Sequence, residues 1–193
     1  MNEKERLKEI ENSRRKRMRK EREYLRGEFD AVCKEFFPRW KNAGEWKVKA
    51  TWKIDPGFFG ECHHESSHEP KTILIKSEGL LHSDLKRLVS FYDNRHRTWH
   101  GKIVGVRLTS KQALQCLLIH EICHSVTQYG LPHGKRWRDR MLIASERAKN
   151  LGLKKIAQRL YEEIKLHKFN ESYERKEEKL MQELRRRCRK EFK

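Results

Sequence analysis

The spacing of apolar residues along the chain changes near residue 46. Before that point, apolar side chains recur at helical intervals, which predicts a helix that enters a core and ends before Pro38. Its apolar positions are Leu25, Phe29, Val32 and Phe36. From residue 46 to 54, apolar and polar residues alternate instead, which predicts a half-buried strand. The turn sequence Asp55-Pro56-Gly57 closes that strand.

Three further short segments have the residue types of strands. They lie at residues 58–62, 71–76 and 102–108. Between the last two, residues 83–100 begin with apolar residues at helical spacing and continue as a polar loop. The strand segments together predict a small antiparallel or mixed sheet.

Four amphipathic helices are predicted in the second half of the chain. The first covers residues 111–129, with Ser110 as its N-cap and Gly130 as its terminator. The second covers residues 135–150, and its apolar stripe consists of Trp137, Met141, Ala144 and Ala148. Two more are expected at residues 153–164 and 173–188, the last of them densely charged. A group of strands next to a group of helices is typical of the α+β class.

Length and charge divide the chain into three parts. The chain has 193 residues, with 46 Lys and Arg against 28 Asp and Glu, for a net charge of +18. Such a length fits one domain with extensions. Residues 1–23 carry a net +4 and residues 154–193 a net +6. We therefore expect a basic helical arm at 1–23, a packed domain at 24–152 and a basic helical C-terminal extension at 153–193.

Several protein classes are disfavoured by the same composition. No apolar run approaches the roughly 20 residues of a transmembrane helix, and the first residues contain no signal sequence. The cysteines are odd in number and scattered, at Cys33, Cys62, Cys116, Cys123 and Cys188. That pattern favours reduced thiols in an intracellular protein, either cytoplasmic or DNA-associated. A large positive charge favours a polyanionic partner, for which nucleic acid is the obvious candidate.

The stretch His120-Glu121-Ile122-Cys123-His124 carries the most informative chemistry. Residues four apart lie on one face of a helix, so both imidazoles could bind one Zn²⁺. Glu121 would lie beside the open position of that metal, where a carboxylate can accept a proton from water and pass it to a leaving amine. The predicted helix supplies the context that this H-E-x-x-H motif requires.

A hydrolytic zinc site needs a third protein ligand. His133 follows His124 by nine residues, after a turn at Gly130-Leu131-Pro132 that would bring the chain back towards the metal. A metzincin is excluded, because it would need glycine at 127 and histidine at 130. Glu146, 22 residues after His124, is the ligand that a thermolysin-like enzyme would use, and it remains an alternative to His133.

The motif, the pair His133-Gly134 and the aromatic Trp137 in a helix that closes at Leu151-Gly152 together resemble the SprT-like (Spartan-related) zinc metallopeptidase family. The resemblance covers roughly residues 25–152, and some members of the family cleave proteins crosslinked to DNA. It implies a zincin-like minidomain, in which a small sheet packs on the active-site helix.

The resemblance also assigns roles to individual residues. It implies that His120, His124 and His133 bind zinc and that Glu121 is the catalytic base. The function expected is therefore that of a zinc metalloendopeptidase acting on DNA-associated proteins. The chain differs from many members in lacking paired cysteines after the core. The alternative is a nucleic-acid-binding protein whose zinc site is structural or vestigial and which has no protease activity.

Two basic clusters are candidates for nucleic-acid contacts. One lies in the N-terminal arm and the other at the start of the helix after His133. Their residues are Arg14, Arg15, Lys16, Arg17, Arg19, Lys20, Lys135 and Arg136. The alternative for both clusters is an ordinary solvated helix face. The segment Cys62-His63-His64, with His68, is a weaker candidate for a second metal site, and we expect it to be a polar loop.

Overall fold

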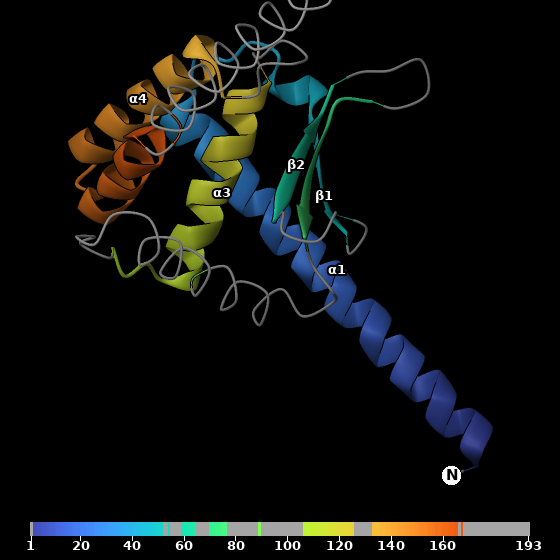
Figure 1. Ribbon diagram of the computed structural model, residues 1–193. Helices are drawn as coiled ribbons and strands as arrows, with labels where there is room; N and C mark the ends of the chain where they lie inside the picture. The colour runs from blue at the N-terminus through green and yellow to red at the C-terminus, as the bar shows by residue number, and fades with distance from the viewer. Residues whose placement is uncertain are drawn as a thin grey trace, which may run out of the picture.

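The structure of the protein is a computed structural model. It describes residues 2–51, 54, 59–64, 70–76, 89, 106–125, 133–165 and 167. The elements, in chain order, are α1 (Glu3–Phe36), the short 3₁₀ helix η1 (Ala43–Glu45), β1 (Lys47–Thr51), β2 (Gly60–His63), β3 (Thr72–Lys76), α3 (Ser110–His124) and α4 (Lys135–Asn150). A further helix covers residues 154–165. The fold is α+β, as predicted, and Figure 1 shows the sheet on one side of α3 and α4 on the other.

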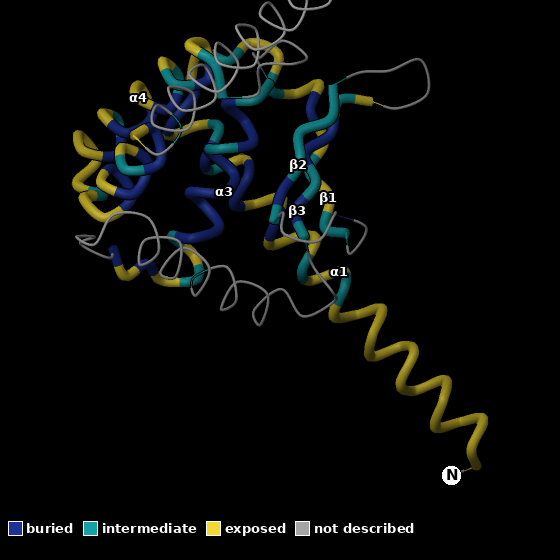
Figure 2. The backbone as a smooth tube through the Cα atoms, viewed as in Figure 1, coloured by how far each residue is buried: buried dark blue, intermediate teal, exposed yellow. Residues whose placement is uncertain are grey.

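Helix α1 combines the predicted arm and the predicted core helix in one element. Its N-terminus is closed by a capping box between Asn2 and Glu5. The part before residue 24 is almost entirely exposed and extends away from the packed body (Figure 2). Its C-terminal part is buried at the predicted apolar positions, Leu25, Phe29, Val32 and Phe36. The helix ends at Phe36, before Pro38, as the sequence indicates.

The three described strands form one mixed sheet in the order β1-β3-β2. Strand β3 is central and lies parallel to β1 and antiparallel to β2. Its side chains Ile73 and Ile75 are fully buried against the helices. Strand β2 therefore forms an edge of the sheet among the described residues, and it also contacts α3. This contact brings an edge strand beside the helix that carries the histidine motif.

Helix α3 passes through the centre of the packed domain. Ten of its residues, from Ala113 to Cys123, are buried. A helix that is apolar on nearly all sides is typical of such a central position. The N-cap is Thr109 and not Ser110, because the Thr109 side chain and Gln112 form a reciprocal capping box. This capping box stabilises the first turn of α3 and involves no residue of the H-E-x-x-H motif.

Helix α4 matches its predicted bounds, and its predicted stripe is buried. It ends in a turn that depends on Gly152, whose φ is +75°. The amide of Gly152 bonds the carbonyl of Lys149, and the amide of Leu153 bonds that of Ala148. This is the double hydrogen-bond pattern of a Schellman motif. The turn reverses the chain, so that the helix of residues 154–165 packs back onto the domain.

The helix of residues 154–165 belongs to the same core as α3 and α4. Its buried apolar residues are Ile156, Ala157, Leu160 and Ile164. The predicted C-terminal extension begins at residue 153, but its first part packs with the domain. Residues 173–188, predicted as a further helix, lie outside the described residues.

Two other predictions are tested in part. Residues 106–108, expected at the end of a strand, are described outside any strand, although Val106 and Leu108 are buried. The rest of that strand, nearly all of the short helix expected at residues 83–100 and residues 126–129 of the helix expected at 111–129 lie outside the described residues. Helix α3 itself ends at His124 with Ser125 as its C-cap, five residues before the predicted end at residue 129. Among the described residues, no helix is long and apolar enough to cross a membrane.

Candidate metal centre

Three imidazole rings converge at the C-terminal end of α3. His120 and His124 project from successive turns of that helix, and His133 lies just before α4. The Nε2 atom of His120 is 3.0 Å from Nε2 of His124 and 3.3 Å from Nε2 of His133. All three residues are partly buried, and their ligand atoms lie within 4.8 Å of one another. The residues predicted from the motif and its spacing therefore form a group that could bind a metal ion.

The geometry of this group fits a shared cation. Zn²⁺ bonds of about 2.0–2.1 Å in a tetrahedral site separate neighbouring ligand atoms by roughly 3.3–3.4 Å, close to the spacings of the imidazole nitrogens. An imidazole nitrogen has one lone pair and accepts one good hydrogen bond. Because two rings approach the same Nε2 atom of His120, a common ion explains the arrangement better than a chain of hydrogen bonds.

The other nitrogen of His120 is held by a carboxylate from the helix of residues 154–165. Nδ1 of His120 lies 2.6 Å from Oε1 of Glu163. Burial acts to lower the pKa of His120, but the charge of Glu163 and this hydrogen bond outweigh it and raise the pKa. For Glu163 itself, burial acts to raise the pKa, whereas the charges of His120 and Arg159 prevail and lower it. Glu163 is therefore ionised and Nδ1 of His120 carries a proton.

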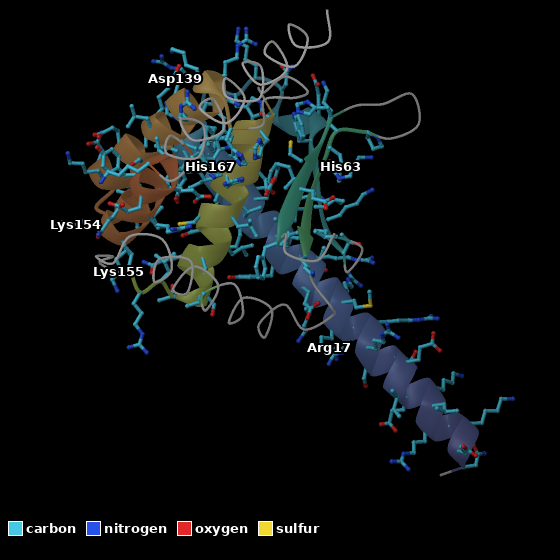
Figure 3. The ribbon with its side chains drawn as sticks, in the orientation of Figure 1. Arg17, His63, Asp139, Lys154, Lys155 and His167 are labelled. Atoms are coloured by element: carbon cyan, nitrogen blue, oxygen red, sulfur yellow. The ribbon has the colours of Figure 1, made fainter. Side chains whose placement is uncertain are left out.

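His133 is held between two other rings. The ring of His167 stacks on it with a centroid distance of 3.7 Å, and the ring of Trp137 meets it edge-on at 4.8 Å. Burial, followed by the neighbouring imidazoles, lowers the pKa of His133 to about 2. His133 is therefore neutral and keeps the lone pair that a metal ligand needs. His167 lies beside α3 in Figure 3.

Glu121 lies on the side of α3 that faces β2. It is 4% exposed, and burial raises the pKa of its carboxyl group to about 7. The close approach to β2 depends on Gly60, since a Cβ atom there would lie 2.6 Å from Oε1 of Glu121. A carboxyl group with a pKa near neutrality is suited to accept and return a proton.

The alternative ligand and the second candidate metal site are not supported. Glu146 is exposed on α4 and pairs with Lys149 at 4.0 Å, away from the three imidazoles. Cys62 and His63 belong to β2, which confirms the strand expected at 58–62 for residues 60–62 and shows that the loop expected for the Cys62-His63-His64 segment is wrong for its first two residues. Nε2 of His63 lies 2.8 Å from Glu61, and His64 bonds the backbone carbonyl of His124 at 3.1 Å. His68 lies outside the described residues.

The basic residues predicted for nucleic-acid contacts are on the surface and lie in two places. Six are exposed on α1, and Figure 3 shows one of them, Arg17, on the part of the helix beyond the packed body. Arg15 and Arg19 each form an ion pair with a glutamate four residues away. Lys135 and Arg136 are exposed in the first turn of α4, where Lys135 pairs with Asp139. They follow His133 in the sequence by two and three residues.

Three contributors to the site were not identified from the sequence. Glu163 and His167 come from a charged segment and follow His124, the last residue of the motif, by 39 and 43 residues, where nothing in the sequence distinguishes them from the charged residues around them. Gly60 is an isolated glycine whose role depends on the packing of β2 against α3. The only usable signal is the apolar spacing of Ile156, Leu160 and Ile164, which indicates that this segment has a buried face.

Comparison with known proteins gives no family for the chain, since no family model, curated protein or solved structure matches it significantly.

Proposed function

We propose that the protein is a zinc-dependent metallopeptidase of the SprT-like kind, with a zincin-like arrangement of sheet and active-site helix. The observation that carries this proposal is the convergence of three Nε2 atoms at the end of α3, with the buried carboxyl group of Glu121 next to them in sequence. Three protein ligands leave a coordination position for substrate or water, whereas a structural zinc usually has four. The absence of a fourth ligand from the group among the described residues favours catalysis.

In this proposal His120, His124 and His133 hold the metal, and Glu121 transfers protons. A bound Zn²⁺ supplies Lewis acidity that polarises a peptide carbonyl and acidifies water. Glu121 accepts a proton from the attacking water and delivers it to the nitrogen of the leaving amine. Gly60 gives its carboxyl group the room to take up this position. The edge strand β2 lies beside Glu121, where an extended substrate could reach the site.

The proposal predicts one zinc ion per chain, bound through His133. We expect the purified protein to contain one equivalent of zinc, to lose protease activity in a chelator and to regain it when zinc is restored. His133→Ala should weaken zinc binding by more than about 100-fold, because it removes a direct ligand. His63→Ala on β2 is the matched control and should bind zinc as the wild type does. Zinc analysis and a casein digestion assay measure both properties, and a zinc-free, active wild type would contradict the proposal.

We further propose that the substrates are proteins bound or crosslinked to DNA. The support is the run of exposed basic residues from Arg14 to Lys20 on the extending part of α1. Two of its six basic residues, Arg15 and Arg19, form exposed ion pairs with glutamates, and such exposed pairs are weak. The surface can therefore contact phosphates without reading bases. Lys135 and Arg136 would add positive charge near the entrance of the zinc site.

The DNA proposal predicts a salt-dependent affinity that depends on α1. Exchanging Arg14, Lys16, Arg17 and Lys20 for glutamine should weaken binding to single-stranded DNA. It should also reduce the slope of log K against log salt by roughly 0.7 for each phosphate that the variant no longer neutralises. The control for a general loss of positive charge is the exchange of Lys149, Lys154 and Lys155 for glutamine. These three lysines lie far from α1 in the sequence. Fluorescence anisotropy across a salt series measures the slope, and an unchanged slope in the α1 variant would refute the assignment.

A further inference from the structure

We infer that Glu163 is a positioning residue for the metal centre, which orients His120 through its Nδ1–H group and has the guanidinium of Arg159 as a buried counter-charge. This inference rests on the proposed zinc site. It concerns a residue outside the H-E-x-x-H motif, in the segment that the sequence places after the domain. It implies that the helix of residues 154–165 is part of the metal centre.

The first support is the geometry of the hydrogen bond. Oε1 of Glu163 lies 2.6 Å from Nδ1 of His120, and the side chain of Glu163 is 6% exposed. At this distance the two atoms share a hydrogen bond, in which the ring Nδ1–H group donates and the carboxylate oxygen accepts. The Nε2 atom of a neutral ring then keeps its lone pair, and this atom is the one that faces His124 and His133. A hydrogen bond from the non-ligating nitrogen fixes both the tautomer and the ring orientation of a metal-binding histidine.

The second support is the buried charge behind Glu163. Arg159 lies one turn earlier on the same helix, is 1% exposed, and has its Nη2 atom 3.6 Å from Oε2 of Glu163. Two buried charges cost desolvation free energy that apolar residues of similar size would avoid. A contribution to folding stability therefore does not by itself explain why these two charged residues are buried. The pair places a positive charge 3.6 Å from the carboxylate that contacts His120, a distance that is too long for a direct hydrogen bond.

The third support is the route by which the chain brings this helix to the site. The Schellman turn at Gly152 reverses the chain after α4, and Ile156, Leu160 and Ile164 then bury one face of the helix against the core. Glu163 lies next to Ile164 and is thus placed by packing that is independent of any metal. His167, which is also helical, stacks on His133, so the same segment contacts two of the three ligands.

Zinc affinity is the measurement that tests this role. We expect Glu163→Ala to weaken zinc binding about 10- to 100-fold, and Glu163→Gln to weaken it less, because an amide oxygen can still accept the Nδ1 hydrogen bond. Glu162→Gln is the matched control, since Glu162 lies beside Glu163 but pairs with Lys165 at 3.2 Å on the surface. Competition with a chromogenic chelator gives the dissociation constants. Glu163 variants that bind zinc within about twofold of the wild type would overturn the inference.

A second variant and a second readout separate positioning from folding. Removal of Glu163 alone leaves the charge of Arg159 in the core, so the double change Arg159→Met with Glu163→Met removes both charges of the pair together. We expect this variant to bind zinc more weakly than the wild type at temperatures where both are folded, and a wild-type affinity would overturn the inference. In ¹⁵N spectra of the zinc-free protein, recorded at a pH high enough for the His120 ring to be neutral, His120 should be the Nδ1–H tautomer in the wild type and a mixture in Glu163→Ala. An unchanged tautomer in that variant would also overturn it.

The outcomes distinguish this inference from the proposed function. A wild type that binds no zinc removes the proposed function and the positioning role together. A wild type that binds zinc tightly, with Glu163 variants that bind it equally well, removes the positioning role alone. A wild type that binds zinc but cleaves no protein removes the proposed function, whereas weaker zinc binding by Glu163→Ala would still establish the positioning role.

Discussion

Replacement of Glu121 by glutamine is expected to lower the rate of peptide hydrolysis by about 10²–10⁴-fold while zinc binding persists. Glutamine has the shape of glutamate and fits the space opposite Gly60, but it cannot accept and return a proton at neutral pH. The three imidazole ligands do not involve the Glu121 side chain, so the metal content should not change. Zinc analysis and the initial rate of casein cleavage, measured on the same preparation, test both parts.

The same experiment decides between catalysis and a structural or vestigial zinc site. A nucleic-acid-binding protein with a structural zinc would have no need of Glu121, and Glu121→Gln would then behave as the wild type does in every assay. Glu146→Gln is the control, because the Glu146 side chain is 61% exposed and pairs with Lys149 on the surface of α4. Equal cleavage of a DNA-bound protein by the wild type and by Glu121→Gln would refute the catalytic proposal.

The prediction of the three-histidine group succeeded because its determinants are local. His120 and His124 are four residues apart on one helix, so helical geometry alone places them together. His133 follows after a short connection that leads into α4, and a short connection limits how far its ring can lie from the helix end. The bounds of α4 were predictable for the same reason, since apolar spacing within this helix depends only on neighbouring residues, whereas α3 ends five residues before its predicted end at residue 129.

The supporting residues depend on packing between distant segments and could not be predicted in this way. The hydrogen bond between His120 and Glu163 joins residues 43 apart, and it requires the reversal at Gly152 and the burial of a helix that is highly charged overall. The contact of Gly60 with Glu121 requires the register of β2 against β3 and the packing of this edge on α3. Neither follows from a periodic pattern, because both are consequences of tertiary structure.

The N-cap of α3 shows a smaller limit of sequence reasoning. Thr109 and Ser110 are adjacent residues that both favour the cap position, and propensity does not distinguish them. The choice of Thr109 follows from Gln112 three residues later, which accepts a hydrogen bond from the backbone amide of the cap. The sequence contained this signal, since a Ser or Thr with Glu or Gln three residues later is the pattern of a capping box.

Replacement of Trp137 by alanine is expected to destabilise the protein by about 3–5 kcal/mol, the usual cost of removing a large aromatic side chain from a core. Trp137 is fully buried, and its ring lies 5.0 Å from that of His120 and 4.8 Å from that of His133. Its Nε1–H group also donates a hydrogen bond to the backbone carbonyl of His120 at 3.3 Å. The melting temperature should fall by roughly 6–20 °C.

Two variants on α4 separate the contributions of Trp137 to this effect. Trp137→Phe keeps most of the ring but loses the hydrogen bond, so it should cost less than Trp137→Ala. Leu142→Ala removes a side chain that is 43% exposed on the same helix, and surface changes of this kind usually alter stability by no more than about 0.5 kcal/mol. Because Trp137 packs between the motif helix and His133, its loss should also weaken zinc binding, which Leu142→Ala should leave unchanged. Urea unfolding with and without zinc measures both effects. If Trp137→Ala were as stable as Leu142→Ala, the packing of α4 against the histidine group would be wrong, and with it the placement of His133 beside His120.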